Sequence, residues 1–91
     1  MSITLRLPTV LAKAAGGETV HRAQGATVGD VVADVAQRFP ELGPRLRDAK
    51  GEPYPYVIFY LDDEDIRFQQ GFKTPVPEGA EIIVVPAIAG G

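Results

Sequence analysis

The amino-acid sequence predicts a single α+β domain in which one main helix packs on one face of a mixed β-sheet. Three observations lead to this prediction. The chain has 91 residues, the length of one small domain. Short segments with the two-residue periodicity of strands lie on both sides of one longer segment with the spacing of an amphipathic helix. Glycines and prolines stand between these segments, so we expect turns and loops there.

Two strands are expected before the helix. Residues 3–7 alternate apolar and polar side chains, which is typical of a half-buried strand. Residues 18–23 form the second strand, in which we expect Val20 to face the core and His21 to lie on the other face. Residues 9–17 then form the long connecting loop of an N-terminal β-hairpin.

The clearest helix spans residues 27–39. Thr27 is a favourable N-cap, and Asp30 places a carboxylate in the first turn, a variant of the capping box. Pro40 ends the helix, because the residue before a proline disfavours the helical conformation. Apolar side chains form one stripe that should pack on the sheet, namely Val28, Val31, Val32, Val35 and Phe39.

The segment after the helix is broken by glycines and prolines. We expect a short helical turn at residues 44–47, anchored by Leu42 and Leu46, and then an exposed loop. Residues 56–61 are apolar on both faces, as in an interior strand. Residues 62–65 are acidic but lack the spacing of a calcium loop, so we expect a solvated turn.

The remaining segments complete the fold. Residues 66–68 are expected to form a short edge segment, residues 69–79 an irregular loop, and residues 81–85 the last strand. The resulting ββαββ order, with one helix on one face of a mixed sheet, predicts a β-grasp-like arrangement.

Alternation along the strands assigns the two faces of this sheet. The side chains expected on the helix side are Leu5, Leu7, Val57, Phe59, Leu61, Ile82 and Val84. Ile58, Tyr60, Ile83 and Val85 then lie on the opposite face, beside the last residues of the chain. Exposed apolar patches usually mark a partner surface. The alternative is that loop 69–79 or another copy of the chain covers them.

Composition excludes several classes of function. The chain has no cysteine, so it has no disulfide, no thiolate metal site and no cysteine nucleophile. A single histidine rules out a two-histidine site, and we expect no metal and no bound cofactor. The net charge of −3 argues against nucleic acid and membrane as partners. No signal peptide or membrane span is evident, so we expect a soluble, cytoplasmic protein.

The C-terminal segment is where we expect the function to reside. A β-branched run ends at Pro86, and a short apolar stretch then leads to Gly90 and Gly91. We expect a domain of residues 1–86 followed by a flexible tail of residues 87–91 that ends in a reactive carboxylate. Glycine has no Cβ, so this tail fits a slot too narrow for other residues. The alternative is an ordinary frayed C-terminus.

The predicted ββαββ order and three segments, residues 61–68, 77–81 and 85–91, carry a family resemblance. Over its whole length the chain resembles the ubiquitin-like sulfur carrier proteins. Residues 62–68 and the Pro-Ala-Ile-Ala-Gly-Gly ending look most like the cysteine-biosynthetic sulfur carrier of actinobacteria. The thiamine carriers are shorter, and the small subunit of molybdopterin synthase often has a more aromatic last strand.

This resemblance implies a protein cosubstrate rather than an enzyme. An E1-like adenylating enzyme would activate the Gly91 carboxylate with ATP, and a sulfur donor would convert it to a thiocarboxylate. A synthase would then accept the sulfur for cysteine or, alternatively, for molybdopterin, thiamine or a thiolated secondary metabolite. A metalloprotease that trims the adduct is a further implied partner. The residues expected to bind partners are Ile58, Tyr60, Ile83, Val85, Pro86, Ala87, Ile88 and Ala89, with Gly90 and Gly91 at the reactive end.

A second function stays open at this point, that of a ubiquitin-like modifier. In a modifier, the activated carboxyl of Gly91 is joined to lysines of other proteins. Both functions need Gly90, Gly91 and an adenylating partner, so the sequence alone separates them poorly.

Overall fold

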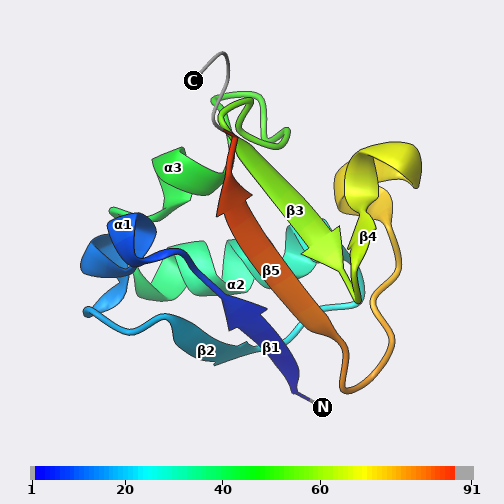
Figure 1. The fold of residues 1–91 in the computed structure, drawn as a ribbon, viewed down its shortest axis with the longest axis horizontal. Coiled ribbons are helices and arrows are strands. Elements are labelled where there is room, and N and C mark those ends of the chain that lie inside the picture. The colour runs from blue at the N-terminus through cyan, green and yellow to red at the C-terminus, as the bar shows by residue number, and fades with distance from the viewer. Residues whose placement is uncertain (1, 88–91) are drawn as a thin grey trace.

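The computed structural model describes residues 2–87, which form a five-stranded mixed sheet with the main helix across one face (Figure 1). The order of the strands across the sheet is β2-β1-β5-β3-β4. The central strand β5 runs parallel to β1 and antiparallel to β3. The bounds are β1 (Ile3–Arg6), β2 (Val20–Ala23), β3 (Val57–Leu61), β4 (Glu64–Asp65) and β5 (Glu81–Pro86). The predicted α+β, β-grasp arrangement is confirmed.

Six helical segments connect or cover these strands. The longest, α2, crosses behind the sheet in the view of Figure 1. No helix of residues 2–87 is long and apolar enough to cross a membrane. The bounds are α1 (Thr9–Ala12), α2 (Val28–Arg38) and α3 (Gly43–Leu46), with 3₁₀ turns η1 (Lys13–Ala15), η2 (Ile66–Phe68) and η3 (Gly71–Lys73).

Helix α2 begins and ends where the sequence predicts. The Thr27 hydroxyl accepts a hydrogen bond from the Asp30 backbone N–H at 3.2 Å, which satisfies one free donor of the first turn. Phe39 is the C-cap residue, directly before Pro40. The four valines of the predicted stripe are fully buried, whereas Phe39 at its end is partly buried.

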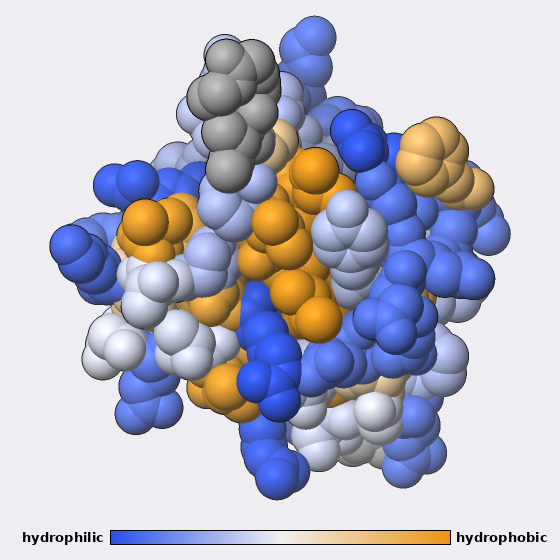
Figure 2. Space-filling model, in the orientation of Figure 1, coloured by the Kyte–Doolittle hydropathy of each residue, from blue (hydrophilic) through white to orange (hydrophobic). Residues whose placement is uncertain are grey.

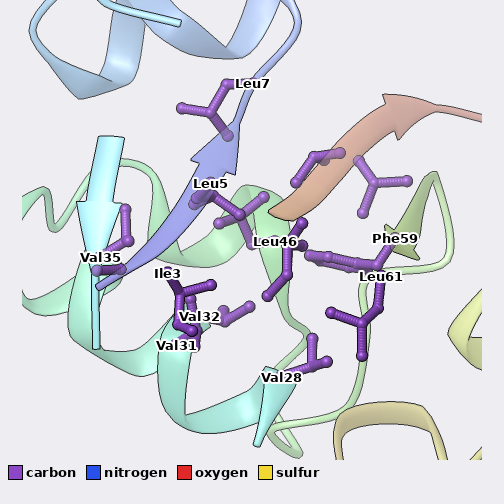
Figure 3. Packing of buried hydrophobic residues seen from close by; sticks show 14 of the residues in the cluster. Ile3, Leu5, Leu7, Val28, Val31, Val32, Val35, Leu46, Phe59 and Leu61 are labelled. Atoms are coloured by element: carbon purple, nitrogen blue, oxygen red, sulfur yellow. The ribbon is translucent and has the colours of Figure 1, made fainter. Parts of the chain in front are cut away.

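The core lies between α2 and the sheet (Figure 3). Valines of α2 face the side chains of β1, β3 and β5, and the Phe59 ring meets the Phe72 ring edge-on with centroids 5.2 Å apart. Leu42 and Leu46 bury completely and anchor α3 against this core, as predicted. The predicted helix-side residues Leu5, Leu7, Val57, Phe59, Leu61, Ile82 and Val84 are all buried.

Strand β2 corrects one prediction. Val20 is 44% exposed and His21 is only 8% exposed, so their faces are the reverse of those expected. The cause is the register with β1, in which Leu5 lies opposite His21 and Arg6 lies opposite Val20. Directly opposed residues of antiparallel strands share a face, so His21 follows Leu5 to the helix side.

The predicted loop at residues 9–17 is in fact mostly helical. The Leu11 and Ala12 N–H groups donate to the Pro8 carbonyl at 3.0 Å, and η1 continues the helical path to Ala15. Leu11, Ala12 and Ala15 are buried, so packing against the core stabilises α1 and η1. Gly16 then reverses the chain with a φ of 72°, as expected for the predicted turn.

The segment after β3 also differs from the prediction. Asp62 and Asp63 have φ values of 47° and 74° and form the tight turn of a β3–β4 hairpin. Residues 66–68 form η2 instead of an edge strand. Asp65 caps this turn, because its carboxylate accepts the Arg67 N–H at 2.8 Å.

The backbone of residues 69–79 is hydrogen-bonded to residues at the start of α2. The Val28 N–H donates to the Thr74 carbonyl at 3.0 Å, and the Val76 N–H donates to the Ala26 carbonyl at 2.9 Å. Phe72 packs so closely on Gly29 that a Cβ there would lie 3.0 Å from the Phe72 Cβ. This loop therefore lies on the helix side of the fold.

A matched pair of phenylalanine truncations tests this core. Phe59→Ala should lower the free energy of unfolding by about 3–5 kcal/mol, because it leaves a cavity at a side chain that is 1% exposed. Phe68→Ala should change it by only about 0.5 kcal/mol, since that ring is 84% exposed. Urea unfolding measures both, and equal losses would contradict this assignment of the core.

The Asp65–Arg67 pair predicts an acid dependence of stability. Hydrogen bonds from the Arg67 side chain lower the pKa of Asp65 below its ordinary value of 3.8, against an opposing effect of burial. Because the folded pKa is the lower one, the stabilisation is present above pH 3.8 and disappears as the pH falls through the folded pKa.

Asp65→Asn should therefore be less stable than the parent at pH 7, and the difference should shrink as the pH falls below 3.8. Urea unfolding at several pH values measures this difference. Glu78→Gln removes an exposed carboxylate and controls for the change in net charge. A deficit of Asp65→Asn that is unchanged in acid would show that the ion pair does not contribute.

Candidate functional site

The pairing of β3 with β5 forms one apolar patch on the outer face of the sheet. Ile58 lies opposite Val85, and Tyr60 lies opposite Ile83. All four are partly exposed, whereas the residues that alternate with them from Val57 to Leu61 and from Ile82 to Val84 are buried on the helix side. Figure 2 shows hydrophobic side chains gathered at the centre of this face, over β3 and β5. We call these four residues the outer patch.

Charged groups border the outer patch on both sides. On the β1 side, Arg6 lies opposite Ile83 and forms an ion pair with Glu81. On the β4 side, Asp65 lies opposite Tyr60 and pairs with Arg67, with 2.6 Å between Oδ2 and Nη2. An apolar centre with a polar rim is the usual anatomy of a protein interface.

Loop 69–79 does not cover the outer patch. Its hydrogen bonds and the Phe72 ring fix it to α2, on the opposite side of the sheet. The alternative that this loop covers the four residues is therefore wrong. Contact with another copy of the chain stays open as an alternative.

The end of β5 lies beside the outer patch. Pro86 is the last strand residue, opposite Val57, so β5 runs one residue further than predicted. The Ala87 N–H donates to the Tyr56 carbonyl at 2.9 Å, which extends the hydrogen bonding between β5 and the β3 side by one residue. N–H groups alternate in direction along a strand, so the nitrogen of Pro86 faces the β1 side. There β1 pairs only with Glu81–Ile83, and the missing proline N–H breaks no ladder bond.

The reactive end itself lies outside the described residues. Of the predicted partner-binding residues, Pro86 is exposed and Ala87 is partly exposed at the top of β5. Ile88, Ala89, Gly90 and Gly91 lie beyond residue 87, so the flexible tail and its reactive carboxylate stay predictions.

His21 belongs to the core rather than to this site. Its ring meets the Phe39 ring edge-on with centroids 5.1 Å apart, and Nε2 donates to the Glu18 carbonyl at 2.7 Å. Alternation within the second strand predicts His21 on the outer face and gives no sign of this core role, because only the β1–β2 register reveals it.

Carboxylates of the acidic turn between β3 and β4 form contacts within the domain. The Asp62 carboxylate accepts the Glu81 N–H at 3.0 Å, and Asp65 pairs with Arg67. Within residues 2–87, no three metal-ligating side chains gather into a cluster.

The fold agrees with that of similar proteins. A family model described as the ThiS family matches residues 5–91. Sulfur carrier protein CysO of Mycobacterium tuberculosis (strain H37Rv) is 34% identical over 93 residues, which cover 100% of both chains. A chain of the crystal structure of the Amycolatopsis orientalis BexX/CysO complex superposes with a TM-score of 0.90 and 35% identity, covering 98% of this chain and 99% of that chain.

The solved structure of a protein that is not named as a sulfur carrier is also similar to this chain. SAMP1 from Haloferax volcanii has a TM-score of 0.82 and 26% identity, with 100% of both chains covered. The family model nevertheless spans almost the whole chain, and the sulfur carrier protein that is 34% identical aligns from end to end. The chain therefore belongs to the ThiS family, and it is similar over its full length to a sulfur carrier protein.

Proposed function

We propose that this chain carries sulfur on its C-terminal Gly91, as a protein cosubstrate of partner enzymes. The observation that carries the proposal is the family match, which extends through Gly91 and joins the chain to full-length sulfur carriers. An E1-like enzyme adenylates the Gly91 carboxylate with ATP, in the cytoplasm. A sulfur donor then displaces AMP and leaves a thiocarboxylate.

The chemistry explains why activation is needed. An α-carboxylate is ionised at neutral pH and is a poor electrophile. Adenylation attaches a good leaving group, so that a sulfur nucleophile can attack the carbonyl carbon. The product is a soft nucleophile that can pass its sulfur to a partner's substrate. The chain contributes delivery, and the partner contributes the catalytic groups and the ATP site.

The outer patch supports the docking step of this proposal. Val85 lies two residues before Ala87 and Ile58 lies opposite Val85, so a partner that covers this end of the patch also lies near the start of the tail. The partners we propose are the adenylating enzyme, a synthase that accepts the sulfur, and a metalloprotease that trims an adduct.

The product that we propose is cysteine. CysO is the name shared by the full-length relative and by a chain in the similar crystal structure. That crystal structure also contains BexX, which supports a complex between a carrier of this kind and a second protein. Molybdopterin, thiamine and a thiolated secondary metabolite are the alternative products.

A modifier is the second candidate function. The similarity to SAMP1, a small archaeal modifier protein, favours it. The two functions differ in the mass of their products. Exchange of one oxygen for sulfur on the intact chain favours the carrier, whereas adducts of the chain on lysines of other proteins favour the modifier.

Charge substitutions in the outer patch should weaken docking without unfolding the domain. Val85→Asp or Tyr60→Asp would place an unpaired carboxylate in the proposed interface, which should weaken binding of the adenylating enzyme at least about tenfold. Val10→Asp is the matched control, because Val10 is exposed on α1, away from the patch. Calorimetric titration measures binding. Parallel losses of thermal stability and binding would indicate core residues instead.

Changes at the last two residues should abolish activation. Deleting Gly91 withdraws the carboxylate by about 3.3 Å, and misplacement of that size costs on the order of 100-fold or more in rate. Gly90→Val should act similarly, because a β-branched side chain widens the tail inside a narrow channel. ATP–pyrophosphate exchange and intact mass measure both variants.

The unfolding curves of both variants should overlay that of the parent, since the changes lie beyond β5. Exchange and sulfur gain at the parent's rate after deletion of Gly91 would show that the C-terminus is not the reactive group.

A further inference from the structure

An open groove lies on the helix side of the fold, next to the end of β5. Its volume is about 690 Å³. The end of α2, helix α3 and the loop that follows α3 form its walls, and most of the lining is apolar. The apolar part of the lining includes Ala36, Pro40, Pro44, Ala49 and Tyr54, and the charged residues of the lining are Arg47 and Asp48.

Arg47 brings a positive charge into this apolar lining. Its backbone N–H donates to the Gly43 carbonyl at 3.0 Å, which fixes the residue at the end of α3. Among residues 2–87, the guanidinium takes part in no ion pair or side-chain hydrogen bond. The carboxylate of Asp48, the anion of the lining, accepts hydrogen bonds from the backbone N–H groups of Lys50 and Glu52, both at 2.9 Å. The groove thus offers an apolar wall and one cation that can bind an anion.

The groove begins close to Ala87, the last residue that the structure describes. Tyr54, in its lining, meets the Tyr56 ring edge-on with centroids 5.4 Å apart. The Tyr56 carbonyl in turn accepts the Ala87 N–H at 2.9 Å. Four extended residues reach about 13 Å. This reach is enough for the tail to pass Tyr56 and enter the groove at Tyr54, which is two residues before Tyr56.

Residues 88–91 also match the groove chemically. Ile88 and Ala89 are apolar, as is most of the lining, and Gly90 and Gly91 add no bulk. If Gly91 carries the free carboxylate, on which the proposed function rests, the segment ends in an anion that complements Arg47.

We propose that this groove binds the chain's own residues 88–91, with Ile88 on the apolar wall and the Gly91 carboxylate at Arg47. The contact is intramolecular, so a weak interaction suffices for a measurable bound fraction. While the tail is in the groove, its carboxylate is not available to the adenylating enzyme. The groove therefore lowers the tail's apparent affinity for that enzyme by the fraction that stays free.

Backbone amide chemical shifts test this proposal on the chain alone. The chain ending in the Gly91 carboxylate is compared with the same chain ending in a C-terminal amide, which removes the charge without shortening the tail. We expect shift differences at the groove residues Gly43, Arg47 and Tyr54. Arg47→Gln should abolish these differences. Arg45→Gln is the matched control, because Arg45 is exposed on the same helix and lies outside the groove lining.

Two results would overturn the proposal. The first is a set of differences confined to residues 85–87, or equal differences in the parent and in Arg47→Gln. The second is a dependence of the differences on protein concentration, which would assign the groove to the tail of a second copy. Unfolding curves confirm that the Arg47→Gln domain is intact.

Enzyme kinetics give an independent readout. In ATP–pyrophosphate exchange, Arg47→Gln should lower KM about two- to fivefold and leave kcat unchanged, since it only releases the tail. A higher KM would show that Arg47 contacts the enzyme instead, against the proposal. The chemical shifts require no partner, so failure of the sulfur-carrier function would leave that arm of the test intact.

Discussion

The central position of β5 is the constraint on which the rest of the structure depends. It pairs with β1 on one side and with β3 on the other. Because side chains alternate, this one strand gives Ile82 and Val84 to the core and Ile83 and Val85 to the outer patch. A register slip of one residue would exchange the two sets. The same ladder therefore specifies the stability of the domain and the surface proposed for docking.

The covering elements all gather on the other face of the sheet. Helix α2 is rich in valine, a weak helix former, so it depends on packing against the sheet. Loop 69–79 contacts α2 through Thr74 and Phe72. The two buried leucines that anchor α3 belong to the same layer. These elements complete the core from the helix side of the sheet. The domain therefore does not need a covering layer on the outer face, and the outer patch stays accessible.

Sequence periodicity predicted those parts of the fold in which local signals agree. For α2, the Thr27 cap, the valine stripe and Pro40 all indicate the same helix. In the second strand, the phase of alternation depends on a long-range register, and apolar character alone assigned Val20 to the wrong face. The outer patch followed from alternation, whereas the chemistry of Gly91 came from resemblance. The groove was missed because three separate elements form it.

The position of the last hydrogen bond that residues 2–87 form between the β5 end and the β3 side determines how far from the sheet the C-terminal residues can reach. Beyond the bond from the Ala87 N–H to the Tyr56 carbonyl, a fully extended chain of the four residues to Gly91 would span about 13 Å. A partner's active site must therefore come within that distance of the end of β5. Val85 of the outer patch is only two residues before Ala87, so a partner that holds Gly91 also lies near the patch. Docking and delivery are then coupled by the length of the tail, whereas the groove on the helix side holds the tail only when no partner does.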